Sequence, residues 1–358
     1  MNDVREKYLR ILRAGLWDGP CAEEVTEEIF LTASAQATTG LICRNSAKRE
    51  HREEIMRLMM IHLKTGAVLS EVISTLEANG INCVLLKGQG CASYYFQPML
   101  RNCGDIDIFV GGENYSGACS ILSSMAGAGS SCSESAKHMH TSFKGIPVEI
   151  HRIAENMPTP RTDRLFREWS LEGLTGDTVP VTMDGFTFRT PEDNFNAVYI
   201  FNHLFHHFIA AGIGFRQICD WTMFLHRKAG LLDTEKLGER LRALGMMEAW
   251  RTFGYIAVNS LGLDASEMPF YDGTVAAKAD RLLEMIFRSG NFGRLRMAGR
   301  KRSGNYWIAK TGSLFRHSLY TLETVRLFPQ LALVSYAGTV GKGLAQVASD
   351  ISEGKVSQ

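Results

Sequence analysis

Two aspartates stand one residue apart in an otherwise apolar run, at Asp105 and Asp107 in the stretch GDIDIFV. Side chains alternate across a β-strand, so both carboxylates would project from one face while Ile106 and Ile108 project from the other into the core. Two carboxylates side by side repel each other unless a divalent cation lies between them. Magnesium suits this arrangement, because it takes carboxylate and phosphate oxygens and keeps water at its remaining positions. The spacing therefore predicts a magnesium site.

A third carboxylate is expected on a neighbouring strand. Glu149 in the stretch PVEIH fits this role, because the apolar residues on either side of it would face the opposite way. His151 would point in the same direction as Glu149 and orient it. His138 and His140 share one face of the preceding segment. They either line the cleft or lie exposed on a hairpin.

A glycine turn precedes the aspartates, over residues 87–90 with the sequence KGQG. A strand, this turn and the start of a helix would leave backbone N–H groups free to hold an anion, with Lys87 nearby as a point charge. A phosphate bound at the turn would reach a metal ion held by the two aspartates. The alternative is a structural ion pair between the aspartates and Lys87 or Arg101.

The positions of apolar residues predict the elements that must hold these groups. Most of residues 1–80 follow the helical period, with Asn79-Gly80 as a stop. The expected elements after it are a strand over 81–87, a helix over 91–96, a strand over 105–110, a helix over 113–127 and hairpins over 137–152 and 178–190. From Thr190, expected as a helix N-cap followed by Pro191, the pattern is helical to the end.

This layout predicts an α+β protein in which a small mixed sheet with helices is flanked by two helical regions. The expected units are an N-terminal helical region over 1–80, an α/β core over 81–157, a linker with a β-hairpin over 158–190 and a C-terminal helical region over 191–358.

Composition limits the kinds of partner. The chain has 358 residues, is 45% hydrophobic and has a net charge of +1, so it can bury a large core and has no overall field for nucleic acid. Its eight cysteines show no metal-ligand spacing and are expected as reduced thiols. No apolar run reaches the length of a membrane span, and the N-terminus does not have the layout of a signal peptide. These features predict a cytoplasmic protein.

The segment LLKGQGCASYYFQPMLRNCGDIDIFV, over 85–110, resembles the signature of the uncharacterised bacterial nucleotidyltransferase family, a branch of the DNA polymerase β-like nucleotidyltransferase superfamily. The downstream VEIH resembles the family's acidic residue and histidine on a later strand. The likeness spans about Leu31 to Leu225 and is strongest over 85–110. It implies a polymerase-β-like sheet in the α/β core.

The resemblance also implies roles for individual residues. Asp105, Asp107 and Glu149 would be catalytic metal ligands. The nucleotide-binding residues would be Lys87, Gly88, Gln89, Arg101 and Gly104. In the wider superfamily a serine usually follows the loop glycine, whereas here Gln89 follows Gly88.

The implied reaction is transfer of a nucleoside monophosphate from ATP or another NTP to a hydroxyl or phosphate acceptor, with release of pyrophosphate. The acceptor would be a small molecule, a sugar or a protein, and transfer to an RNA end is a less favoured alternative. Two Mg²⁺ ions about 3.5–4 Å apart, with Mn²⁺ as a substitute, would clamp the attacking and leaving oxygens. The competing hypotheses are a catalytically silent nucleotide-binding regulatory or interaction protein and a structural helical scaffold.

Further residues have both a structural and a functional interpretation. Arg216 and Asp220 are four apart on an expected helix, which favours a surface or interdomain salt bridge, with a contact in the cleft as the alternative. His203 and His207 have the i, i+4 spacing of zinc sites, yet packing of that helix face on the α/β core is preferred.

Residues 281–330 contain ten basic and two acidic residues. A solvated face is the usual meaning of such a run, and a contact with a membrane surface or a protein through 281–345 is the alternative.

Overall fold

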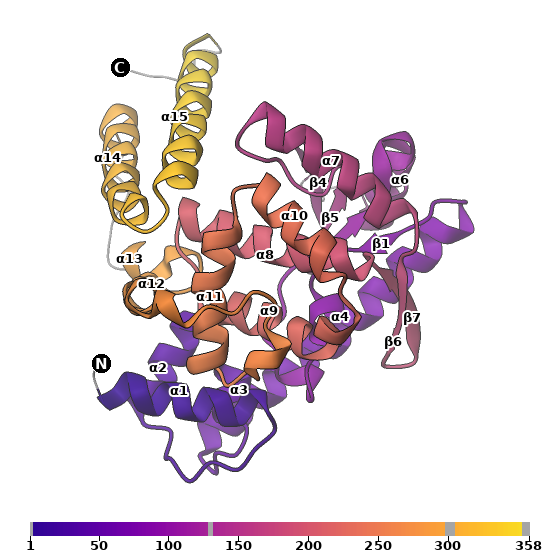
Figure 1. Cartoon of the computed structure of the whole chain (residues 1–358). Coiled ribbons are helices and arrows are strands. Elements are labelled where there is room, and N and C mark those ends of the chain that lie inside the picture. The colour runs from indigo at the N-terminus through magenta and orange to yellow at the C-terminus, as the bar shows by residue number, and fades with distance from the viewer. Residues whose placement is uncertain (1–2, 128–131, 298–304, 353–358) are drawn as a thin grey trace.

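The acidic motif lies on a mixed sheet of five strands, and helices surround this sheet (Figure 1). The computed structural model describes residues 3–127, 132–297 and 305–352. The sheet has the order β1 (Val84–Leu85), β2 (Ile106–Phe109), β5 (Ile146–His151), β4 (His138–Phe143) and β3 (Ser133–Glu134). The α+β class that the sequence predicts is confirmed.

Strands β2 and β5 are parallel neighbours at the centre of the sheet, and the remaining pairs are antiparallel. The predicted hairpin joins β4 to β5 through Lys144 and Gly145, which both have positive φ angles, 51° and 75°. The second predicted hairpin is β6 (Val179–Met183) and β7 (Phe186–Thr190), and its Asp184-Gly185 turn has φ angles of 50° and 79°. Two successive positive φ angles are typical of the type I′ turn that Asp-Gly favours.

One face of the sheet is apolar and covered by two helices. Ile106 and Ile108 on β2 and Val148 and Ile150 on β5 are at most 1% exposed. They pack in one buried cluster with side chains of α4 (Arg49–Ala78) and α6 (Gly111–Ala126). The sequence stop at Asn79-Gly80 agrees with the end of α4. Because neighbouring residues alternate in direction, the other face is left for the polar side chains.

The N-terminal and C-terminal helices share one hydrophobic core. The first three helices are α1 (Asp3–Leu16), α2 (Glu27–Gln36) and α3 (Thr39–Cys43). The ring of Tyr8 on α1 lies 5.6 Å from that of Phe215 and 5.7 Å from that of Phe287, both beyond the sheet in sequence. The two helical regions therefore pack against each other as well as against the sheet.

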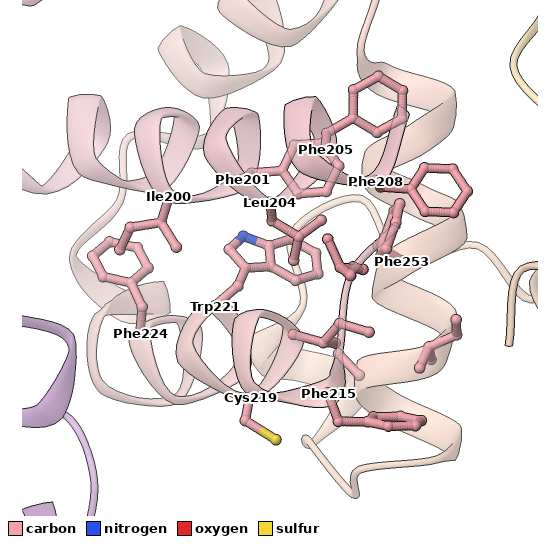
Figure 2. Close-up of a cluster of buried hydrophobic side chains, with 14 of the residues drawn as sticks. Ile200, Phe201, Leu204, Phe205, Phe208, Phe215, Cys219, Trp221, Phe224 and Phe253 are labelled. Atoms are coloured by element: carbon pink, nitrogen blue, oxygen red, sulfur yellow. The ribbon is translucent and has the colours of Figure 1, made fainter. Parts of the chain in front are cut away.

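Helix α8 is central to the C-terminal region, where it contacts α7, α9, α10, α14 and α15. Figure 2 shows its residues Phe201 and Leu204 beside Trp221 of α9. The ring of Phe201 lies 5.0 Å from the rings of Trp221 and Trp250. The helices from there on are α8 (Asp193–Ala210), α9 (Phe215–Lys228), α10 (Thr234–Ala243), α11 (Met247–Asn259), α12 (Ala276–Ser289), α13 (Arg294–Met297), α14 (Tyr306–Val325) and α15 (Pro329–Ser352).

Three local predictions are wrong. The helix expected over 91–96 is only the short α5 (Gln89–Ala92), because the chain turns after it to bury Tyr94 and Tyr95. The segment expected as a linker with a hairpin also contains α7 (Pro160–Thr175), which begins with a capping box at Thr159. The N-cap of α8 is Glu192 rather than Thr190. Its carboxylate accepts hydrogen bonds from the backbone N–H groups of Asn194 and Phe195.

Short 3₁₀ helices complete the chain: η1 (Pro98–Leu100), η2 (Ala229–Leu231), η3 (Ala265–Glu267), η4 (Gly273–Val275) and η5 (Asn291–Gly293). Within the described ranges, no helix combines the length and apolar character needed to cross a bilayer.

In the basic segment over 281–330, Arg300, Lys301 and Arg302 lie outside the described residues. Arg288 is paired with Glu323, and Arg296 lies over the ring of Tyr320 at 3.8 Å. A membrane or protein contact through this segment stays a prediction.

Candidate active site

Three neighbouring strands place polar side chains on one face of the sheet. Asp107 on β2 is aligned with Glu149 on β5, which is aligned with His140 on β4. Two residues further along the strands, His151 on β5 is aligned with His138 on β4. Residues two apart share a face, so these five side chains belong to the face opposite the apolar core.

The three predicted carboxylates converge. Asp105 directly precedes β2 and lies two residues before Asp107. One carboxylate oxygen each of Asp105, Asp107 and Glu149 can be chosen so that all three lie within 4.8 Å of one another. Asp105 is exposed, Glu149 is half-buried and Asp107 is fully buried. The charge of Asp107, and after it burial, raises the pKa of Asp105. A cation bound between the carboxylates would relieve this repulsion.

Asp107 is held by two basic groups. The Nζ of Lys87, which follows β1, lies 2.9 Å from Asp107 Oδ1, and His151 Nε2 lies 3.1 Å from the same oxygen. Burial alone would raise the pKa of Asp107, but Lys87 and His151 hold it well below the usual value. Asp107 therefore stays ionised although water does not reach it.

The environment of the second carboxylate oxygen of Asp107 indicates whether these residues suit a metal ion. Asp107 Oδ2 is buried and has no hydrogen-bond partner among the described residues. A buried carboxylate oxygen without a partner is costly. A hard divalent ion such as Mg²⁺ prefers oxygen ligands of this kind, so the three carboxylates fit it.

His151 joins two of the carboxylates. It is fully buried, and its Nε2 lies 3.2 Å from Glu149 Oε2 as well as close to Asp107. Burial alone would lower the pKa of His151, but its hydrogen bonds to Asp107 and Glu149 outweigh burial and raise it. His151 thus orients Glu149, as the sequence predicts, and does not line the cavity. His140 Nδ1 lies 3.5 Å from the other oxygen of Glu149, Oε1.

The glycine turn runs directly alongside the acidic motif. Gly88 has a φ of +62°, and a Cβ at this position would lie 2.9 Å from the backbone oxygen of Asp105. Both observations explain why glycine is needed there. The side chain of Gln89 is turned away and donates a hydrogen bond to the backbone oxygen of His62 at 3.0 Å. Gln89 is 1% exposed, so the structure places it behind the turn.

A cavity of about 250 Å³ lies above the carboxylates. Asp105 and Glu149 line it from the sheet, and Lys87, Gly88 and Gly104 line it from the adjoining loops. Residues of α8 and α9 form the opposite wall. The space above the carboxylates is therefore an open cavity and is not filled by packed side chains.

The segment that contains most of the cavity-lining residues identifies the family to which the chain belongs. A comparison with known protein families matches residues 47–262 to the family described as uncharacterised nucleotidyltransferase. The chain belongs to this nucleotidyltransferase family. Nothing among the curated proteins or the solved structures matched it. The match covers more than half of the chain and includes the sheet, the glycine turn and helices α8 and α9.

Family membership makes nucleotidyl transfer the general class of activity and a nucleotide the substrate. Nucleotidyltransferases generally use divalent metal ions, and the acidic cluster of Asp105, Asp107 and Glu149 is a candidate site for them.

The salt bridge expected between Arg216 and Asp220 is absent from the described part of this nucleotidyltransferase. Asp220 instead accepts two hydrogen bonds from Arg101, from Nε at 2.7 Å and from Nη2 at 2.8 Å. Tyr95 donates a third at 2.7 Å. Arg101 and Asp220 are 5% and 6% exposed, so the pair is buried beside the cavity. The charge of Arg101 is therefore already neutralised within the protein.

Arg216 is left without a carboxylate partner among the described residues. It lines the cavity, and its Nη1 donates to the backbone oxygen of Asn102 at 3.4 Å. A Cβ at Gly104 would lie 3.3 Å from the same nitrogen, so the guanidinium packs directly beside the acidic motif. Burial, and after it the charge of Arg101, lowers the pKa of Arg216. An anion in the cavity would offset both effects.

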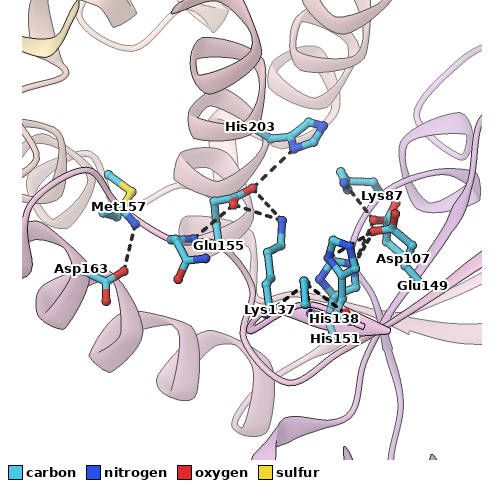
Figure 3. A network of polar contacts seen from close by, with 12 residues as sticks. Lys87, Asp107, Lys137, His138, Glu149, His151, Glu155, Met157, Asp163 and His203 are labelled. Carbon is cyan, nitrogen blue, oxygen red and sulfur yellow. Dashed lines mark hydrogen bonds and ion pairs between the residues drawn. The ribbon is translucent and has the colours of Figure 1, made fainter. Parts of the chain in front are cut away.

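The cavity wall also contains residues that the sequence did not single out. Lys137 Nζ lies 3.0 Å from both carboxylate oxygens of Glu155 (Figure 3). His203 on α8 faces the same carboxylate, with Nδ1 at 3.8 Å from Oε2. Burial would raise the pKa of Glu155, but His203 and Lys137 hold it well below the usual value. Lys137 and Glu155 lie just outside β4 and β5, where no periodic pattern marks them.

His203 and His207 are neutral residues of this wall. Burial, and after it the charge of Lys87, lowers the pKa of His203 to about 4. Burial and His203 lower the pKa of His207 to about 2. Both side chains lie in the cavity wall, where His203 faces Glu155, which follows β5.

Proposed function

We propose that this protein is a magnesium-dependent nucleotidyltransferase that moves a nucleoside monophosphate from an NTP to a hydroxyl or phosphate acceptor and releases pyrophosphate. The single observation that carries the proposal is the convergence of the three carboxylates at the floor of an open cavity. Oxygens of Asp105, Asp107 and Glu149 lie within 4.8 Å of one another, and the cavity above them has a volume of about 250 Å³.

Asp105, Asp107 and Glu149 are the proposed metal ligands. Divalent ions bound there would polarise the phosphate and bring the attacking and leaving oxygens together. The acceptor oxygen bonds to the α-phosphorus, the bond from that phosphorus to the pyrophosphate oxygen breaks, and Glu149 accepts the acceptor's proton. Glu149 suits this role because it is half-buried and reaches the cavity, whereas Asp107 lies beneath it.

Positive charge for the phosphate groups comes from Lys87 and Arg216 in this proposal. Lys87 lines the cavity beside the carboxylates, and its side chain is 14% exposed. Arg216 lies beside Gly104 and lacks a carboxylate partner in the described chain. An arginine fork suits the oxygens of a phosphate group. We therefore assign to Arg216 the phosphate contact first expected of Arg101, which is committed to Asp220.

A catalytically silent nucleotide-binding protein is the second candidate. The position of Gln89 favours it, because the side chain after the loop glycine points to His62 and offers the phosphates no contact. The same cavity and carboxylates would then bind the nucleotide for regulation or interaction. The acceptor would be a small molecule, a sugar or a protein only if the reaction takes place.

Calorimetric titration of ATP, GTP, CTP and UTP, each with and without Mg²⁺, tests binding in the wild type and in Asp105→Asn. Asp264→Asn is the control, because Asp264 is exposed and lies outside the cavity. We expect magnesium-dependent binding in the wild type and the control but not in Asp105→Asn. Pyrophosphate release in the presence of a cell extract then separates the enzyme from the silent protein. Equal NTP binding by the wild type and Asp105→Asn would exclude both.

A further inference from the structure

Two imidazoles lie beside the carboxylates on the same sheet face. His138 on β4 and His151 on β5 are aligned partners, and their ring centroids are 4.9 Å apart. Together with Glu149 they form a second group whose ligand atoms all lie within 4.8 Å of one another. This group differs from the carboxylate cluster, because two of its three donors are nitrogens.

The distances within this group suit a tetrahedral ion. His151 Nε2 lies 3.1 Å from Asp107 Oδ1 and 3.2 Å from Glu149 Oε2, and His138 Nδ1 lies 3.5 Å from that Glu149 oxygen. Ligands about 2.0–2.1 Å from a zinc ion at the corners of a tetrahedron are about 3.3 Å apart. The separations of this Glu149 oxygen from His151 Nε2 and His138 Nδ1 are therefore close to those of a metal-bound set.

One of the donor atoms has no other partner. His138 Nδ1 is buried and makes no hydrogen bond within the described ranges. His151 is fully buried at 0% exposure, and its Nε2 is directed at the two carboxylates. Figure 3 shows the two rings together with Glu149 and Asp107 at one end of the polar network. A buried imidazole nitrogen without a partner is costly, and a metal ion bound among these donors would satisfy His138 Nδ1.

We propose that His138, Glu149 and His151 form a binding site for a divalent transition-metal ion of the zinc type, with a water molecule as the fourth ligand. Imidazole suits such ions, whereas Mg²⁺ takes oxygen ligands in an octahedron. The site lies next to the proposed magnesium site and shares Glu149 with it. Asp105 belongs only to the magnesium site, and His138 belongs only to the new one.

The inference goes beyond the proposed function, because this ion binds without a nucleotide and would be present whether or not nucleotidyl transfer occurs. In an active enzyme it would hold Glu149 in place at the acceptor side. The two metal positions would then be chemically different, one built from oxygen donors and one from nitrogen and oxygen donors.

Visible absorption during titration with Co²⁺ alone tests the site, because tetrahedral cobalt with nitrogen ligands absorbs far more strongly than octahedral cobalt. We expect the full-length wild type to bind one Co²⁺ with the tetrahedral spectrum. Zn²⁺ should displace it, and Mg²⁺ at the same concentration should not. His138→Ala should weaken Co²⁺ binding by more than about 100-fold, beyond the loss typical of residues outside the ligand set.

Two further variants keep this test separate from the proposed function. Asp105→Asn should retain the cobalt spectrum, and His226→Ala, on α9 outside the cavity, is the matched histidine control. The side chain of His138 is 24% exposed, so its removal should leave the far-UV circular dichroism unchanged. The inference is overturned if the wild type shows only the octahedral spectrum, or if Asp105→Asn loses the tetrahedral spectrum while His138→Ala keeps it. Failure of the proposed function would appear instead as absent magnesium-dependent NTP binding.

Discussion

Lys87 Nζ lies 2.9 Å from Asp107 Oδ1, and the two side chains are 14% and 1% exposed. The lysine thus places a positive charge directly beside the carboxylates that would bind metal. This ion pair makes the environment of Asp107 different from that of Asp105, the other aspartate of the motif. Asp107 is part of the buried structure, whereas Asp105 is exposed and is repelled by Asp107.

The first prediction contrasts the two aspartates. Asp105→Asn and Asp107→Asn should each reduce pyrophosphate release by about 100-fold or more, because the metal contributes several kcal/mol to the transition state. Asp107→Asn should also lower the free energy of unfolding by about 3–5 kcal/mol, since it leaves a buried lysine unpaired. Asp105→Asn should not destabilise, because it removes a repulsion. Urea unfolding of both variants measures this difference, and equal stability losses would contradict it.

A second prediction concerns Arg216. Arg216→Gln should weaken binding of Mg·ATP by about 1.5–3 kcal/mol, the contribution of a hydrogen bond to a charged group. Stability should change little, because no carboxylate within the described chain is left without its partner. Titration calorimetry measures the affinity. Arg227→Gln is the matched control on the same helix, because its guanidinium lies over the ring of Phe96 away from the cavity. Equal affinities for the two variants would remove Arg216 from the site.

A third prediction concerns the buried pair of Arg101 and Asp220. Asp220→Asn should lower the free energy of unfolding by about 3–5 kcal/mol, because the guanidinium loses both charge-assisted bonds in a buried place. Asp272→Asn, at a partly exposed ion pair with Arg251, should lose about 1 kcal/mol or less. Urea unfolding at pH 7 compares the two. A small loss in Asp220→Asn would mean that the pair is not a structural element.

The fourth prediction is a pH dependence of stability. His203 and His207 have folded-state pKa values of about 4 and about 2, whereas unfolded histidine titrates near about 6.5. Between about pH 6.5 and 4 the unfolded chain therefore binds more protons, so the free energy of unfolding falls as pH falls. His151 acts in the opposite direction, because its pKa is raised and its contribution is lost as pH rises.

Paired variants isolate this effect. The double variant His203→Gln, His207→Gln should lose less stability than the wild type between pH 7 and pH 5, by up to about 1.4 kcal/mol per group and pH unit. Urea midpoints at the two pH values give the measurement, and His226→Gln serves as the control outside the cavity. An unchanged pH slope in the double variant would show that the two histidines do not stay neutral when buried.

The local rules of strands predicted the arrangement of the acidic residues. Alternation with period two placed Asp105, Asp107 and Glu149 on one face, and the structure brings them together. The same rule could not predict the neighbours across the cavity. Glu155 and Lys137 lie where the strands end, and their contacts with α8 depend on the packing of a helix about 50 residues later in the sequence.

Helical spacing gave the wrong partner for Asp220. Residues four apart on a helix are neighbours, so Arg216 was the local choice. The partner in the structure is Arg101, 119 residues away in sequence, because α9 packs its Asp220 side against the loop before β2. Similarly, Thr190 has the composition of an N-cap, but it remains in β7 and Glu192 takes the capping position. Long-range packing decided both outcomes.

The contacts of Tyr8 with Phe215 and Phe287 affect how cooperatively the protein unfolds. Tyr8 precedes the segment that matches the family and Phe287 follows it, whereas Phe215 lies within it. The family segment therefore shares buried aromatic contacts with the helices on both sides of it. On heating, the N-terminal helices, the family segment and the C-terminal helices should unfold in a single calorimetric transition. The family segment expressed by itself should aggregate through its exposed aromatic rings.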